Sequence, residues 1–196
     1  MDGVVSALHA VPRGWTARAL GVDQLVARAR RLRAVLTDCD GVLTDGMVHV
    51  SEYGEALLRF SRRDGLGVER LREAGIATAI VTRERSPIVL RRAEKLAVPV
   101  FEGVRDKAAE LPRVLAALGC APHEVAYIGD DVNDLGILEA VGGEGLTAAP
   151  FDAMEPVAAV VHHVCRARGG EGAFRELAEW VLRLRRAGRT DGEEVA

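Results

Sequence analysis

Aspartates gather after two apolar runs of this chain, and the first pair has the spacing that phosphoryl-transfer chemistry needs. The run AVLT at 34–37 is followed by Asp38, and Asp40 stands two positions further on. In extended chain that spacing sends both side chains to the same side. A carboxylate is a competent nucleophile toward phosphorus, and a second carboxylate can protonate the leaving oxygen and later take a proton from water. We therefore assign Asp38 as a candidate nucleophile and Asp40 as a candidate acid/base.

The second acidic group follows the apolar run at 125–128. It consists of Asp130, Asp131 and Asp134. Because the carboxyl ends of parallel strands meet at one edge of a sheet, we expect this group to lie beside Asp38. Such crowded acids would repel one another and a phosphate dianion, so a hard cation with oxygen ligands must sit among them. We predict a Mg²⁺ site formed by the side chains of Asp38 and Asp130 and by the backbone carbonyl of Asp40.

Two further residues are candidates for phosphate contacts. Thr82 ends the apolar run IATAIV and offers a hydroxyl and neighbouring backbone N–H groups. Lys107 is one of only two lysines in the chain, the other being Lys95, among 26 basic residues. Its ammonium would supply a compact positive charge to the phosphate and to the attacking carboxylate. We include Thr82 and Lys107 among the catalytic and substrate-binding candidates.

Other chemistry is less well supported by the residues present. A calcium-loop reading of DCDGVLTDG fails because no glutamate stands at the twelfth position of a loop between helices. Cys39 lies between two aspartates, and neighbouring anions raise the pKa of a thiol, so Cys39 is interpreted as a packing residue.

The pattern of apolar residues predicts how these groups are positioned. Two short strands at 47–50 and 56–60 flank the turn-forming SEYGE and predict a β-hairpin. The remaining elements alternate: helices at 22–32, 65–74, 87–96, 106–118, 134–140 and 173–186, and strands at 34–38, 76–81, 98–101, 125–128, 145–148 and 160–164. Alternation of this kind requires long crossovers, and these place helices on both faces of a mainly parallel sheet. We predict an α/β fold with a doubly wound, Rossmann-like sheet and a hairpin inserted after the first strand.

Composition limits the class of protein and its partners. The 196 residues are 48% apolar and 28% charged, which suits one globular domain. A net charge of −3 offers no field for a polyanion, so we expect no nucleic-acid partner. Three cysteines without metal-ligand spacing indicate reduced thiols and a cytoplasmic location, and no stretch has the length of a membrane span or the form of a signal peptide. We expect an N-terminal extension over 1–21, a phosphatase domain over 22–187 and a flexible tail over 188–196.

Four segments of the sequence resemble, in order, the four motifs of haloacid dehalogenase-type phosphatases. They are VLTDCDGVLTDG, IVTRERS, GVRDK and YIGDDVND. RRDGLGVERLREAGI, RRAEKL and RGGEGAFRE further resemble the branch without a cap domain, which dephosphorylates 2-keto-3-deoxy sugar acids of eight or nine carbons. The resemblance implies the roles given above for the catalytic and metal-binding residues. It also implies a homotetramer in which hairpins such as 47–60 pack together and a neighbouring subunit closes the site.

The chain departs from this pattern directly after Thr82. Arg83 stands where the family usually has glycine. If that glycine served a positive φ, arginine would strain the loop, whereas if only its N–H was needed nothing is lost. This departure leaves open an alternative of another class, a catalytically weak module that oligomerises or stabilises a partner.

Charged residues near the second motif bear on the choice of substrate. Glu84 precedes the predicted helix 87–96, and Arg92 and Lys95 share a face of that helix. We assign Arg83, Glu84, Arg92 and Lys95 to substrate binding, with Arg92 and Lys95 holding Glu84 and the substrate carboxylate. The pattern TxE followed by RRAEKL resembles the nine-carbon phosphatases more closely. The sequence therefore favours a nonulosonate 9-phosphate, with 2-keto-3-deoxyoctulosonate 8-phosphate as the alternative.

Overall fold

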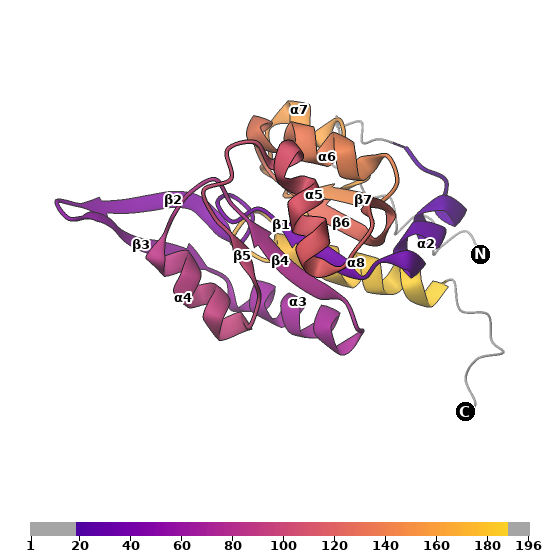
Figure 1. The fold of residues 1–196 in the computed structure, drawn as a ribbon, viewed down its shortest axis with the longest axis horizontal. Coiled ribbons are helices and arrows are strands. Elements are labelled where there is room, and N and C mark those ends of the chain that lie inside the picture. Colours follow the sequence, from indigo (N-terminus) through magenta and orange to yellow (C-terminus); the bar gives the residue numbers. More distant parts are fainter. Residues whose placement is uncertain (1–18, 188–196) are drawn as a thin grey trace.

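The protein is represented by a computed structural model, which describes residues 19–187, so the predictions for 1–18 and for the tail at 188–196 lie outside the described residues. Six strands form one parallel sheet in the order β5-β4-β1-β6-β7-β8 (Figure 1). The strands are β1 (Ala34–Thr37), β4 (Ala77–Val81), β5 (Val100–Phe101), β6 (Val125–Ile128), β7 (Leu146–Ala149) and β8 (His163–Val164). The chain runs outward from β1 in one direction and then from β6 in the other. The predicted doubly wound parallel sheet is confirmed.

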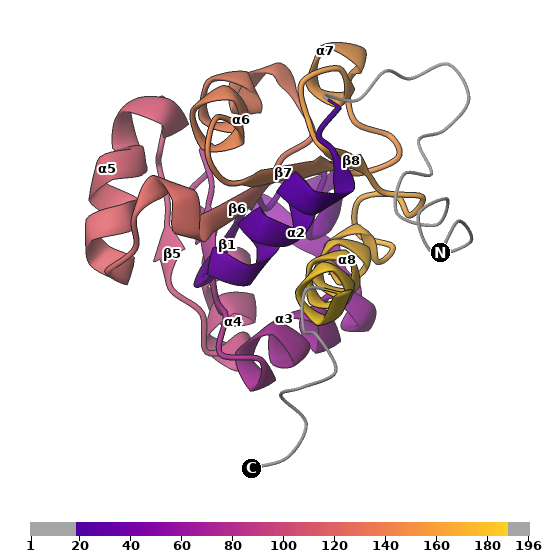
Figure 2. The same cartoon turned by 90° about the vertical axis from the view of Figure 1, so that its right-hand side faces the viewer.

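Helices cover both faces of the sheet, as the view along its edge shows (Figure 2). One layer consists of α2 (Val22–Arg31), α3 (Arg62–Glu73), α4 (Pro87–Leu96) and α8 (Ala173–Ala187). The other consists of α5 (Lys107–Leu118), α6 (Leu135–Gly142) and α7 (Glu155–Ala158), with the short turns η1 (Pro122–Glu124) and η2 (Val132–Asp134). Alternate strand residues face the two layers: Val35 belongs to the first core and Leu36 to the second. Every residue of β1 and β6 is buried, as the strands of a doubly covered sheet must be.

An antiparallel hairpin of β2 (Thr44–Ser51) and β3 (Gly54–Phe60) projects from the body of the molecule (Figure 1). It is inserted directly after β1, as predicted, but its strands are longer than expected. No second folded unit stands over the sheet in the described part of the chain. Among those residues, none of the helices has both the length and the apolar character that a membrane crossing requires.

Most element boundaries agree with the sequence pattern, and the differences have local causes. The predicted strand 98–101 begins only at Val100, because Ala97 ends α4 in the left-handed region (φ 52°) and Pro99 has no N–H to donate. Helix α3 begins at Arg62 rather than 65, because the Ser61 side chain accepts the N–H of Arg63 and caps three polar residues that carry no apolar period.

Candidate active site

A hollow of about 220 Å³ opens where β1, β4 and β6 end. This is the point at which the strand order reverses, where ligands bind in doubly wound sheets. Its lining residues come from the loops after these strands and from the start of the hairpin: Asp38, Asp40, Gly41, Gly46, Thr82, Arg83, Glu84, Asp130, Asp131 and Asn133. The sheet therefore brings the two acidic groups and the Thr82 loop together, as the sequence predicted.

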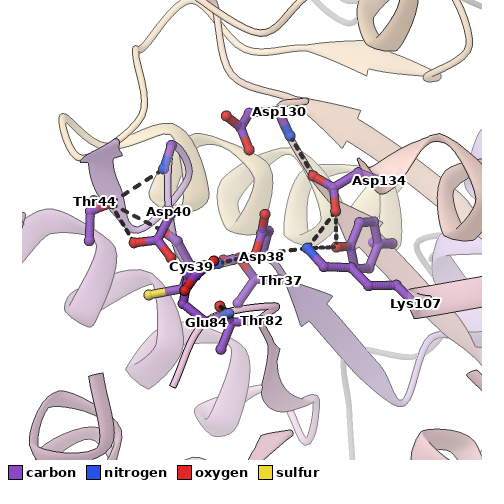
Figure 3. Close-up of polar contacts among 12 residues, drawn as sticks. Thr37, Asp38, Cys39, Asp40, Thr44, Thr82, Glu84, Lys107, Asp130 and Asp134 are labelled. Carbon is purple, nitrogen blue, oxygen red and sulfur yellow. Dashed lines mark hydrogen bonds and ion pairs between the residues drawn. The ribbon is translucent and has the colours of Figure 1, made fainter. Parts of the chain in front are cut away.

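Asp38 is 5% exposed and is held through one oxygen (Figure 3). Its Oδ1 accepts the backbone N–H of Cys39 at 2.7 Å and lies 2.8 Å from the Lys107 ammonium. Within the described part of the chain, Oδ2 accepts no hydrogen bond. Burial raises the pKa of Asp38 to about 7, although the charge of Lys107 opposes the rise. The carboxylate is thus fixed in direction while one oxygen is left for chemistry.

Lys107 lies beneath Asp38 and does not line the hollow. Its Nζ is 2.6 Å from Asp134 Oδ1 and 3.2 Å from the hydroxyl of Tyr127, so each of its three hydrogens has an acceptor within the protein. Burial alone would lower the pKa of Lys107, but Asp38 and Asp134 together raise it. The ammonium is therefore permanently charged. The 2.8 Å distance agrees with the prediction that Lys107 supplies positive charge to the attacking carboxylate of Asp38. A contact between Lys107 and the phosphate stays a prediction.

Asp134 and Tyr127 were not assigned roles from the sequence, and both are fully buried at the site. Tyr127 donates its hydroxyl hydrogen to Asp134 Oδ1 at 2.6 Å, and Asp134 Oδ2 accepts the backbone N–H of Asp130 at 3.0 Å. Asp134 thus joins Lys107 to the loop that carries Asp130. The signal that sequence reasoning passed over is a phenol in the otherwise apolar strand 125–128.

The acidic group after β6 has the properties of a cation site. One oxygen each of Asp38, Asp130 and Asp134 lies within 4.8 Å of the others. Asp130 Oδ1 is buried and has no hydrogen-bond partner among residues 19–187. Burial, followed by the charges of Asp38 and Asp134, raises the pKa of Asp130 to about 8. Gly41 leaves room for this carboxylate, since a Cβ there would stand 2.0 Å from Asp130 Oδ2. Hard oxygen donors that are crowded and short of partners fit Mg²⁺.

Asp40 reaches the same hollow from the turn that follows β1. The strand ends at Thr37, so the turn and not an extended spacing brings Asp38 and Asp40 together, which corrects the reason given from the sequence. Asp40 Oδ1 is 3.5 Å from the Thr44 hydroxyl. Burial first, and then the negative charges of Glu55 and Glu84, raise the pKa of Asp40. A carboxyl group with a raised pKa is suited to carry a proton for transfer.

The loop after β4 places Thr82 and Glu84 at the hollow without strain. Thr82 is buried and its hydroxyl oxygen accepts the N–H of Glu84 at 3.2 Å. Ala97 is the only residue other than glycine with a positive φ in the described part of the chain, so Arg83 does not occupy a conformation reserved for glycine. The Ser86 hydroxyl, which caps α4, donates to Glu55 of the hairpin.

Arg92 and Lys95 do not reach this hollow, which corrects the expectation that they hold Glu84. They line a separate hollow between α3 and α4, together with Arg62, Gly65, Leu66, Glu69 and Leu96. Arg92 donates to the carbonyl of Ser61 at 3.1 Å and lies over the ring of Phe60. Helix α4 starts at the active-site edge and runs away from it, so residues in its second and third turns face α3.

The chain has close relatives of known structure and activity, although no family model matches it. It is 37% identical over 161 residues to the 3-deoxy-D-manno-octulosonate 8-phosphate phosphatase KdsC of Yersinia pestis. The aligned region covers 82% of this chain and 84% of that protein. The KdsC phosphatase of Haemophilus influenzae is 38% identical over 156 residues, 79% of this chain and 85% of the relative. The Moraxella catarrhalis phosphatase, solved in complex with magnesium, phosphate and KDO, superimposes with a TM-score of 0.77 at 30% identity, covering 85% of this chain and 94% of that one.

Proposed function

The chain belongs to the KdsC family of 3-deoxy-D-manno-octulosonate 8-phosphate phosphatases within the haloacid dehalogenase superfamily, and on that premise we propose that it hydrolyses a phosphorylated 2-keto-3-deoxy sugar acid through an aspartyl phosphate on Asp38. It is a phosphatase, as its motifs indicated. The observation that carries the mechanism is the Asp38 carboxylate, held through Oδ1 by Lys107 at 2.8 Å and facing the hollow.

The reaction proceeds in two displacements. An oxygen of Asp38 attacks phosphorus, the bond from phosphorus to the sugar oxygen breaks, and the proton of Asp40 passes to that oxygen. Asp40 then takes a proton from water, whose oxygen attacks the aspartyl phosphate. Inorganic phosphate leaves, and Asp38 returns as a carboxylate with Asp40 protonated. Thr82 is assigned to bind a phosphate oxygen, and Lys107 is assigned to offset the negative charge of Asp38.

Asp38 and Asp130 would hold a Mg²⁺ ion, with the Asp40 carbonyl as a further ligand. When bound, the ion supplies positive charge that offsets the repulsion between the carboxylates and the phosphate. Asp134 does not serve as a ligand in this proposal, because both its oxygens are engaged by Lys107, Tyr127 and the Asp130 N–H.

The relatives support the eight-carbon acid as substrate over the nine-carbon acid that the sequence pattern favoured. We infer that 3-deoxy-D-manno-octulosonate 8-phosphate is the preferred substrate, because the two KdsC relatives carry that name at 37% and 38% identity. Glu84 and Arg83 line the hollow beside Asp40 and are assigned to the sugar hydroxyls. The unstrained Arg83 and the complete set of acids argue against a catalytically weak module. The cytoplasmic location stays a prediction.

We also propose that the chain assembles into a homotetramer. The hairpin exposes the apolar side chains of Met47, Val48, Val50, Tyr53 and Leu57, between 47% and 92% accessible. An isolated two-stranded hairpin is marginal in water, and contiguous apolar surface marks an interface. Arg92 and Lys95 lie outside the active-site hollow of their own chain. In a tetramer they could contact only a substrate that is bound in the active site of a neighbouring copy.

The function is tested by measuring kcat/KM for the eight-carbon and nine-carbon acid phosphates with Mg²⁺, using Asp38→Asn as the inactive control. We expect at least about tenfold preference for the eight-carbon substrate, which is about 1.4 kcal/mol in transition-state binding. Preference for the nine-carbon acid would overturn the substrate assignment. Activity no higher than that of Asp38→Asn on either substrate would overturn the phosphatase mechanism.

A further inference from the structure

The segment RGGEG between β8 and α8 lies against the loop that carries Asp40. Gly170 donates its backbone N–H to the carbonyl of Val42 at 2.9 Å. A Cβ on Gly169 would stand 1.9 Å from the carbonyl oxygen of Gly41, and one on Gly170 would stand 2.5 Å from the backbone N of Asp45. Gly170 also has a φ of +66°. The two backbones touch so closely that only glycine fits at either position.

Two contacts hold this segment in place. Asp152 Oδ1 accepts the N–H of Gly169 at 3.0 Å. Arg59 of the hairpin bridges Glu171 at 3.0 Å and Asp45 at 3.1 Å. These contacts tie the segment that holds the Gly169–Gly170 pair to Asp152 and to the hairpin.

A second acid anchors the helix that follows. Asp64 of α3 is 2% exposed and accepts the N–H of Arg175 at 2.9 Å, in the first turn of α8. Glu176 of the same turn accepts the N–H groups of Arg166 and Ala167, both at 3.0 Å. The segment is therefore tied down at its two ends as well as at Gly169.

Asp40 precedes Gly41, the residue that Gly169 contacts, and the hydrogen bonding of the Asp40 side chain holds it only weakly. Its one side-chain hydrogen bond, to the Thr44 hydroxyl, is 3.5 Å long in the described structure. Thr44 in turn accepts the N–H groups of Gly41 and Gly46 at 3.3 and 3.2 Å. Only the φ and ψ of Gly41 separate its carbonyl from the planar peptide that begins at Asp40, so fixing the Gly41 carbonyl against Gly169 limits where Asp40 can lie.

We propose that Gly169 and Gly170 are positioning residues for the reaction, because their backbone contacts with Gly41 and Val42 set the place of the Asp40 carboxyl group. The proposal rests on the role of Asp40 in the proposed function. It also gives a role to the RGGEG segment, which does not line the active-site hollow. Misplacing an acid by about 1 Å costs on the order of 100-fold in rate.

The consequence depends on the leaving group, which separates a positioning role from a general loss of structure. A sugar alkoxide cannot depart without the proton of Asp40, whereas 4-nitrophenolate departs as a stable anion. Hydrolysis of the aspartyl phosphate is common to both substrates, but kcat/KM reports the steps up to departure of the leaving group. A misplaced Asp40 therefore lowers kcat/KM for the sugar-acid phosphate far more than kcat/KM for 4-nitrophenyl phosphate. A partly unfolded enzyme loses both activities in proportion.

The experiment compares kcat/KM for both substrates in wild type, Asp40→Asn, Gly169→Ala, Asp152→Ala and Gly143→Ala. Gly143 is a matched control, since its conformation is helical and the nearest atom to an added Cβ is 3.8 Å away. We expect the ratio of the two kcat/KM values to change by at least about 100-fold in Asp40→Asn and about 10-fold in Gly169→Ala. Asp152→Ala, which frees the Gly169 N–H without adding a clash, should shift the ratio in the same direction by several-fold, and Gly143→Ala should not shift it.

Each outcome decides one of the two proposals. An unchanged ratio in Asp40→Asn would refute the role of Asp40 itself. A changed ratio in Asp40→Asn with unchanged ratios in Gly169→Ala and Asp152→Ala would refute the positioning role while leaving the proposed function intact. If Gly169→Ala does not fold, the ratio in Asp152→Ala decides.

Discussion

Replacing Asp38 by asparagine should stabilise the metal-free protein, by an amount that grows with pH. Burial raises the pKa of Asp38 from 3.8 to about 7 even though Lys107 is 2.8 Å away. The folded chain therefore prefers the protonated acid. The penalty for folding is small below pH 3.8, grows as pH rises toward about 7, and is constant above that.

The magnitude follows from the size of the shift. One pKa unit corresponds to about 1.4 kcal/mol. Folding the Asp38 carboxyl group into this site therefore costs about 4 kcal/mol at pH 8, where the group stays ionised, and about 2 kcal/mol at pH 5, where folding protonates it. Asparagine has no charge, and its Oδ1 can still accept from Lys107 and the Cys39 N–H. The Asp38→Asn variant should exceed wild type by these amounts in free energy of unfolding.

Urea unfolding in EDTA, followed by circular dichroism at pH 5 and pH 8, measures the difference. Glu139→Gln, an exposed carboxylate on α6, is the control and should change stability by no more than about 0.5 kcal/mol at either pH. Saturating Mg²⁺ should reduce or reverse the difference in free energy of unfolding, because Mg²⁺ stabilises the folded wild type, which binds it, more than the Asp38→Asn variant. A difference between Asp38→Asn and wild type that does not vary with pH, or a less stable variant at pH 8, would refute the reasoning.

Three further predictions concern the same site. Lys107→Arg should lower kcat at least about 10-fold, because a planar guanidinium cannot replace an ammonium placed between Asp38 and Asp134, and near-normal kinetics would show that the lysine is dispensable. Gly41→Ala should abolish tight Mg²⁺ binding in calorimetry, because its Cβ would stand 2.0 Å from Asp130 Oδ2 on a backbone with φ +79°, and unchanged affinity would contradict this. Binding of Mg²⁺ at pH 7 should release protons, since the pKa values of Asp38 and Asp130 lie at about 7 and about 8 and must fall beside a cation; a binding enthalpy that is the same in buffers of different ionisation enthalpy would be evidence against it.

Local signals in the sequence predicted the elements that position the site. Helix α4 begins and ends where predicted, because Ser86 caps it, Pro87 starts it and Ala97 ends it in the left-handed region. Strand β6 is bounded by residues 125 and 128 as expected, since four apolar residues stand between a turn and the acidic loop. The family predicted from the motifs is confirmed by the relatives.

Local signals in the sequence did not predict the contacts between elements that are far apart along the chain. Periodicity places Arg92 and Lys95 on one face of α4, but the direction of the helix decides that this face meets α3 and not Glu84. Tyr127 was not assigned a role from the sequence, because its partner, Asp134, lies across a loop. The nine-carbon preference rested on these charges and on the resemblance of TxE and RRAEKL, and it is not supported over the eight-carbon acid, for which the KdsC relatives are named.

The order of strands has a consequence for how the enzyme is made. Ala34 of β1 pairs with Ala77 and with Val125, so the central strand lacks its second neighbour until more than half of the chain exists. At about 5–20 residues per second, Asp38 leaves the ribosome on the order of ten seconds before the Gly169–Gly170 segment that supports its loop. A nascent chain therefore carries the nucleophile without a working site. Truncation that removes the last thirty or so residues, and with them Gly169 and Gly170, should leave a product that has every acidic motif and no turnover.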